Sequence, residues 1–213
     1  MKTRWFLTLL MMALGSTLAM ASADEPVRDG PVPVIKTGGF RLHESTLQKL
    51  TQKVAQIRFF AAANGYNTER VFLADMGVSS GQYRFFVYNL RNDSLEMAGL
   101  VSHGIGSNSA TGKLRFSNEA GSYQTSLGKY AIGQSYQGKF GLAFKLNGLD
   151  QTNSRAYERA VVLHANDCVP NEEIAPLGVC ESLGCPIVSR DMLAKLQPLI
   201  SKTSNKTLLW IYE

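Results

Sequence analysis

The spacing of apolar residues predicts one long helix near the start of the chain. Ser45-Thr46-Leu47-Gln48 fits a capping box at the helix start, and Asn64-Gly65 supplies the stop, because glycine tolerates the left-handed cap conformation. Apolar side chains between these signals recur three and four residues apart, which gives one stripe on a helix: Leu47, Leu50, Val54, Ile57 and Ala61. We interpret the stripe as a core-packing face rather than a ligand-binding face.

From residue 71 onward the pattern changes to short runs of β-branched, aromatic and aliphatic residues, which favour strands. Asn92-Asp93 between the second and third runs indicates a hairpin. A second helix is predicted over residues 190–200, with Ser189 as its N-cap and Pro198 near its end. The predicted strands are residues 71–75, 83–90, 95–102, 129–132, 142–146, 160–164 and 208–212. Many short strands, Gly-rich connections and few helices predict one mainly β domain with an antiparallel or mixed sheet.

The first residues have the pattern of an export signal. Lys2 and Arg4 precede an apolar run over residues 6–19, and Ala21-Ser22-Ala23 is the expected cleavage site. A transmembrane anchor is the alternative, but Gly15-Ser16-Thr17 interrupts a run already shorter than the roughly 20 apolar residues that a span needs. We therefore expect a signal peptide at 1–23, an extended, Pro-rich lead-in at 24–43 and one folded domain at 44–213.

Composition and charge narrow the classes of partner. The chain has 213 residues and a formal net charge of +5, which falls to +3 if Lys2 and Arg4 are removed with the signal. The surplus is scattered, without Lys/Arg runs or interleaved aromatic residues, so nucleic acid is not expected as a partner. No second apolar segment is long enough to span a bilayer, so stable membrane insertion after signal cleavage is not expected either.

The strongest chemical signal is Cys185, which directly follows a glycine and has a histidine upstream. This pattern can provide a thiolate nucleophile and its base, and His164 stands at the end of a predicted strand. Gly184 permits a tight turn that would aim the amides of Leu183, Gly184 and Cys185 at an oxyanion, and Ser182 would line the pocket. The alternative is structural, because a histidine at a strand end and a buried cysteine before a proline also occur without chemistry.

The other two cysteines, Cys168 and Cys180, lie in a loop rich in proline, glycine and acidic residues. In an oxidising compartment they would form a disulfide worth about 3 kcal/mol and leave Cys185 free. A zinc tetrad of both cysteines with His164 and Cys185 is the rival interpretation. No Cys-x-x-Cys pair is present and the chain has an export pattern, so the disulfide is favoured and no metal is expected.

These motifs, taken in order, resemble those of a known family. His164 followed by Ser182-x-Gly184-Cys185 resembles the signature of the L,D-transpeptidase catalytic domain, the YkuD-type fold of bacterial cell-wall enzymes. Other stretches resemble the subfamily described as murein L,D-transpeptidase catalytic domain-like. These stretches are residues 71–75, 84–90, 101–104, 116–128 and 146–149. The resemblance implies a YkuD-like β-sandwich or barrel of mixed sheets with a long N-terminal helix and a short C-terminal helix.

The resemblance also implies a reaction. Family members attack the amide before the terminal D-Ala of a peptidoglycan tetrapeptide stem, form a thioester, and pass the acyl group to the amine of a second stem. Carried over to this chain, Cys185 is the nucleophile and His164 the base, and no cofactor is required. With water as acceptor the enzyme would be an L,D-carboxypeptidase or another peptidoglycan amide hydrolase, and a non-catalytic peptidoglycan-binding module is the alternative from another class. The expected location is the periplasm, with secretion as the alternative.

The chain departs from the commoner family motif in two places. Leu183 stands where that motif has histidine, and Pro186-Ile187-Val188 follows the cysteine where the motif has an arginine. The group that binds the substrate carboxylate is therefore unassigned, with Arg190, Arg155 and Lys139 as candidates. His103 either lines the cleft in place of the motif histidine or completes a strand end, and the other candidate cleft residues are Ser117, Asn118, Ser122 and Tyr123.

Overall fold

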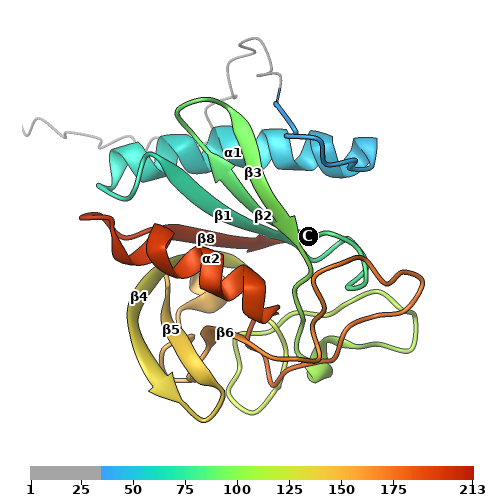
Figure 1. The fold of residues 1–213 in the computed structure, drawn as a ribbon. Helices are drawn as coiled ribbons and strands as arrows, with labels where there is room; N and C mark the ends of the chain where they lie inside the picture. Colours follow the sequence, from blue (N-terminus) through green and yellow to red (C-terminus); the bar gives the residue numbers. More distant parts are fainter. Residues whose placement is uncertain (1–34) are drawn as a thin grey trace, which may run out of the picture. The chain divides into compact units, whose positions relative to one another are not determined.

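A computed structural model of the protein describes residues 35–213 (Figure 1). The predicted signal peptide and most of the lead-in lie outside these residues. Within this range, two helices and eight strands make up the regular structure, together with two short 3-10 helices. The elements are α1 (Glu44–Ala63), β1 (Arg70–Asp75), β2 (Phe85–Asn89), β3 (Ser94–Gly99), η1 (Ile105–Ser107), β4 (Gly128–Gly138), β5 (Gly141–Gly148), η2 (Gln151–Asn153), β6 (Val162–Ala165), β7 (Ile187–Val188), α2 (Arg190–Ser201) and β8 (Leu208–Tyr212).

All eight strands belong to one mixed sheet in the order β3-β2-β1-β8-β4-β5-β6-β7. The pairs β1–β8 and β6–β7 are parallel, and the other neighbours are antiparallel. The last strand of the chain, β8, therefore lies between β1 and β4 and joins the two halves of the sheet. This arrangement, with a long N-terminal and a short C-terminal helix, confirms the predicted mainly β, YkuD-like fold class.

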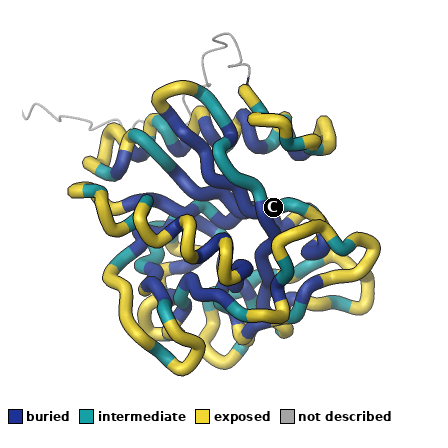
Figure 2. Tube along the Cα trace, in the orientation of Figure 1, coloured by how far each residue is buried: buried dark blue, intermediate teal, exposed yellow. Residues whose placement is uncertain are grey.

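Side chains alternate between two core layers along the strands, as the period of two in a strand requires. On β1, Val71 and Leu73 pack with the apolar stripe of α1, whereas Phe72 and Ala74 pack on the other face with residues of α2. Figure 2 shows the result, with the strands buried and the connections exposed. In Figure 1, α1 runs along β1, β2 and β3.

Among residues 35–213, neither helix combines the length and the apolar character that a bilayer span requires.

The helix caps differ from the predicted N-cap of α1 and agree with the predicted N-cap of α2. The N-cap of α1 is His43 and not Ser45, because Nδ1 of His43 accepts the Ser45 N–H (3.4 Å) and the helix begins at Glu44. The helix ends at Ala63 with Asn64 as its C-cap, which agrees with the predicted stop at Asn64-Gly65. Ser189 is the N-cap of α2, with its Oγ accepting the Met192 N–H (3.1 Å). This helix continues through Pro198 to Ser201.

The strands differ most from the prediction where their residues are polar. Strand β4 extends to Gly138, well beyond the predicted residues 129–132, and its outer part is largely exposed, whereas β5 starts at Gly141, one residue before the predicted residues 142–146. The outer part of β4 therefore carries no apolar signal. The strand β3 ends at Gly99 rather than at residue 102. Residues 100–104 instead run beside residues 182–187, where the Ser102 N–H donates to the Ile187 carbonyl (2.9 Å).

Candidate functional site

The segment from Ser182 to Cys185 forms a tight turn between two fixed ends. The Ser182 N–H donates to the carbonyl of His103 (2.8 Å), and Ser102 Oγ donates to the Cys185 carbonyl (3.3 Å). Gly184 has φ +114, a backbone conformation that favours glycine. A Cβ at this position would lie 2.9 Å from the Gln124 carbonyl oxygen, so the neighbouring loop excludes any side chain there.

The amides of this turn are not all free. The Gly184 N–H donates to Ser182 Oγ (3.0 Å), which corrects the expectation that it points at an oxyanion. Ser182 is thus bound within the turn and orients Gly184. Within residues 35–213, the N–H groups of Leu183 and Cys185 have no hydrogen-bond acceptor, so these two amides remain candidates for an oxyanion site.

The thiol of Cys185 lies against the backbone that leads into β6. The Val162 N–H points at Sγ (3.5 Å), and Sγ lies 3.8 Å from the Ala160 carbonyl oxygen, which it reaches as a weak donor. Ala160 has φ +53, so its backbone is in the left-handed region without being glycine. Burial raises the pKa of the Cys185 thiol, while the Val162 N–H and the Arg159 charge oppose the rise. The resting thiol is therefore protonated at neutral pH, and a base must remove its proton.

His164 lies on β6, two residues after Val162 and on the same face of the strand. Its N–H faces the Pro186 carbonyl (3.5 Å), so its backbone borders the segment that follows Cys185. Its Nδ1 lies 3.2 Å from the Ala165 carbonyl, which can only accept, so Nδ1 carries the proton and Nε2 keeps a free lone pair. Burial lowers the pKa of His164, which leaves the imidazole neutral at pH 7. Its ring stacks on Phe140 from the β4–β5 hairpin.

Sequence reasoning missed Arg159, the cation whose charge acts on the thiol of Cys185. A Cβ at Gly184 would lie 3.2 Å from Nη2 of Arg159, so the guanidinium packs against the cysteine turn. The three candidates for carboxylate binding are each engaged with another group. Arg155 pairs with Glu119 and Glu158, Arg190 pairs with Asp167, and Lys139 lies over the ring of Phe140. In sequence, Arg159 carries no signal that separates it from Arg155.

Four candidate cleft residues lie on the loop that packs against Arg159. The Ser117 carbonyl and Ser122 Oγ accept hydrogen bonds from the guanidinium, and Tyr123 is half exposed with φ +52. Asn118 instead bonds the Gln151 carbonyl and the Arg155 N–H, so it ties this loop to the η2 region. Leu183 in the turn, Ile105, whose N–H donates to the Ser182 carbonyl (2.8 Å), and Tyr123 have exposed side chains.

The side chain of His103 is engaged away from the cysteine. Its Nδ1 lies 3.0 Å from Nη2 of Arg84, and its Nε2 lies 2.9 Å from Oδ1 of Asn108. Since the guanidinium can only donate, Nδ1 is the acceptor and Nε2 carries the proton. Burial lowers the pKa of His103 and keeps it neutral. The structure therefore connects His103 to the cysteine turn through its carbonyl, which accepts from Ser182, and not through its ring.

Cys168 and Cys180 form a disulfide, and Cys185 is the free cysteine. The disulfide closes the loop over a small apolar cluster that includes Leu100, Val179 and Ile187. Because two of the four zinc ligands considered above are bonded to each other, the tetrad cannot form in this structure.

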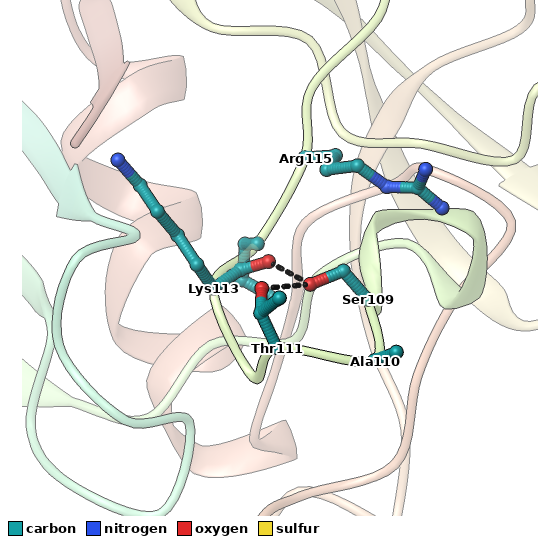
Figure 3. Close-up of a pocket in the computed structure, with 6 residues that line it drawn as sticks. Ser109, Ala110, Thr111, Lys113 and Arg115 are labelled. Atoms are coloured by element: carbon teal, nitrogen blue, oxygen red, sulfur yellow. Dashed lines mark hydrogen bonds between the residues drawn. The ribbon is translucent and has the colours of Figure 1, made fainter.

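Two of the hollows formed by residues 35–213 are lined by the segment that follows η1. One, of about 450 Å³, is open and is lined by residues 109–111 and 113–115. There Ser109 Oγ contacts Thr111 and the Lys113 carbonyl, and the side chains of Lys113 and Arg115 point apart (Figure 3). The other, of about 420 Å³, is lined by residues that include Arg84 and His103. Neither Cys185 nor His164 lines either hollow.

Comparison with known proteins defines the class. Residues 42–212 match the family model of the L,D-transpeptidase catalytic domain, and the chain belongs to this family. Comparison with curated proteins gives no match.

Solved structures of several bacterial proteins are more distantly similar. Bd1075 of Bdellovibrio bacteriovorus is 19% identical (TM-score 0.42), over 67% of this chain and 47% of that one. The helical cell shape determining protein Pgp2 of Campylobacter jejuni is 13% identical (TM-score 0.45), over 68% and 47%. An L,D-transpeptidase from Mycobacterium smegmatis is 13% identical (TM-score 0.40), over 67% and 58%. The chain spans about half the length of these solved proteins.

Proposed function

We propose that this chain is a cysteine acyltransferase that acts on peptidoglycan tetrapeptide stems. Family membership over residues 42–212 supports the class of reaction. The observation that carries the assignment to residues is the contact of Cys185 Sγ with the Val162 N–H (3.5 Å), on the strand that holds His164 two residues later. A free thiol thus lies against the strand that carries a neutral imidazole.

In the first half-reaction, Nε2 of His164 takes the proton of the Cys185 thiol. The thiolate attacks the carbonyl carbon of the diamino acid that precedes the terminal D-Ala, so a C–S bond forms and the carbonyl electron pair moves to oxygen. The free N–H groups of Leu183 and Cys185 are the proposed donors to this oxyanion. Collapse breaks the C–N bond, protonated His164 returns its proton to the leaving D-Ala amine, and a thioester remains.

In the second half-reaction, the side-chain amine of a second stem attacks the thioester and gives a proton to His164. The C–S bond breaks, a new amide joins the two stems, and Cys185 recovers its proton. Water in place of the amine would give a shortened stem, which is L,D-carboxypeptidase activity. The predicted export signal would deliver the domain to an oxidising compartment that also suits the Cys168–Cys180 disulfide.

The test is a product analysis by mass spectrometry. The domain and its Cys185→Ala variant are incubated with purified tetrapeptide muropeptides, and circular dichroism verifies that both are folded. Dimers joined through two diamino acids, formed only with intact Cys185, are the expected result. Shortened monomers with free D-Ala, again only with intact Cys185, would favour the carboxypeptidase alternative.

Absence of any new species in both samples would overturn the proposal for tetrapeptide stems. The binding-module alternative makes a separate prediction. Under that alternative, sedimentation with purified peptidoglycan would be equal for wild type and Cys185→Ala and would be the protein's whole activity.

A further inference from the structure

The guanidinium of Arg159 is held by neutral acceptors alone. Nη1 donates to the Ser117 carbonyl (2.8 Å) and to Ser126 Oγ. Nη2 donates to the Gln124 carbonyl (2.6 Å) and reaches Ser122 Oγ at 3.5 Å. Among residues 35–213, no carboxylate lies within ion-pair distance of this side chain, whereas Arg155 pairs with two carboxylates on the surface. The positive charge of Arg159 is therefore uncompensated by any anion of the described chain.

The same guanidinium borders the cysteine turn from two directions. Through space, its Nη2 would lie 3.2 Å from a Cβ at Gly184, the residue before Cys185. Through the chain, Arg159 precedes Ala160, whose carbonyl oxygen lies 3.8 Å from Sγ. An uncompensated cation beside a thiol favours its ionised form, and a partly buried site weakens the screening by water.

Two other titratable groups face this region. Tyr130 on β4 donates its hydroxyl to the Ser126 carbonyl (2.7 Å), and burial raises its pKa, so it stays neutral at the pH of the reaction. His164 on β6 is neutral as well, since burial lowers its pKa. Arg159 is thus the fixed charge that acts on Cys185.

We propose that Arg159 is the positioning residue of the Cys185 site: held on four neutral acceptors against Gly184, it supplies the positive charge that stabilises the thiolate. The inference rests on the proposed function only in taking Cys185 as the nucleophile. It gives a role to a residue that lies 26 positions before the cysteine in sequence. The burial that raises the pKa of Cys185 is partly offset by this charge.

The test measures thiolate formation without any substrate. The chain has three cysteines and two are in the disulfide, so the rate of iodoacetamide alkylation against pH reports on Cys185. Arg159→Gln keeps hydrogen-bond donors and loses the charge, whereas Arg159→Lys keeps the charge and loses the planar fork. Arg155→Gln is the matched control, because it removes an arginine that does not contact the cysteine turn.

The expected result is an alkylation profile of Arg159→Gln displaced to higher pH, with alkylation at pH 7 slowed about tenfold, the effect of an opposite charge at close range. Arg159→Lys and Arg155→Gln should keep the wild-type midpoint. An unchanged profile in folded Arg159→Gln, or an equal displacement in Arg159→Lys, would overturn the inference.

If Arg159→Gln does not fold, the variants Ser126→Ala and Arg159→Lys together still distinguish an electrostatic role of Arg159 from a structural one. Both variants disturb the hydrogen bonds and keep the charge, so both should keep the wild-type midpoint, and a displaced midpoint in both would show a purely structural role. Because alkylation needs no muropeptide, the profile and the product analysis can fail independently.

Discussion

The imidazole of His164 stacks on the phenyl ring of Phe140, with ring centroids 5.1 Å apart and 17° between the planes. Phe140 lies at the tip of the β4–β5 hairpin and is itself 51% exposed, so it covers the histidine without being part of the core. His164 has only 4% of its surface exposed. The hairpin tip therefore contributes to the burial that lowers the pKa of His164 and keeps it available as a base.

Truncation of this cover should change the pH dependence of the site. In Phe140→Ala, water reaches the imidazole, the pKa of His164 moves up towards its ordinary value of 6.5, and more of the base is protonated in mild acid. The acid limb of kcat/KM should move to higher pH, with activity near pH 6 reduced about two- to threefold. NMR titration of the His164 ring protons measures the shift directly.

Tyr136→Ala is the control for this prediction, because Tyr136 is an exposed aromatic residue on the same hairpin that does not stack on His164. This variant should leave the pKa of His164 unchanged from that in the wild type. A titration of Phe140→Ala that coincides with the wild type would show that the stacked ring does not protect the imidazole.

The two buried histidines should make folding stability sensitive to mild acid. Burial lowers the pKa values of His103 and His164 below 6.5, whereas the unfolded chain protonates near that value. Below about pH 6.5 the unfolded state therefore binds more protons than the folded state. The free energy of unfolding reaches its highest value above this pH and decreases as the pH falls below it. Urea unfolding near pH 7.5 and near pH 5.5 measures the difference, and most carboxylates remain ionised over this interval.

The variant His103→Gln separates the two contributions. It should unfold more easily at both pH values, because the contacts of the ring with Arg84 and Asn108 are lost, yet it should show a smaller difference between them. Equal unfolding free energies of the wild type at the two pH values would contradict the predicted role of the buried imidazoles.

Gly184→Ala should damage the site more than the fold. A methyl group would lie 2.9 Å from the Gln124 carbonyl oxygen in a backbone with φ +114, so the turn must shift at a cost of about 1–3 kcal/mol. We expect loss of muropeptide turnover and an altered rate of Cys185 alkylation. Thermal unfolding and product analysis provide the two readouts.

Gly65→Ala is the matched control, because Gly65 also has positive φ (+70) but nothing within 4 Å of an added Cβ. It should cost about 1 kcal/mol through the backbone alone and leave turnover intact. Full turnover in Gly184→Ala would mean that the turn tolerates a side chain and that its present shape is not required.

Some elements of the fold could be predicted because their sequence patterns are local. The stripe from Leu50 to Ala61 gives α1, since residues one helical turn apart share a face whatever they pack against. The serine at position 189 caps α2 in the same local way. Strand β7 has only two residues and the outer β4–β5 hairpin is exposed, so neither has an apolar period to detect.

The fold class, the family signature and the turn at Gly184 and Cys185 could be predicted from the amino-acid sequence, because each is recorded in short residue patterns and in their order along the chain. Tertiary structure decided the surroundings of that turn. Only folding brings Arg159 against Gly184, stacks Phe140 on His164 and turns the ring of His103 towards Arg84. The charge, burial and hydrogen-bond partners of a side chain depend on segments that are distant in sequence. A local sequence pattern therefore does not predict them.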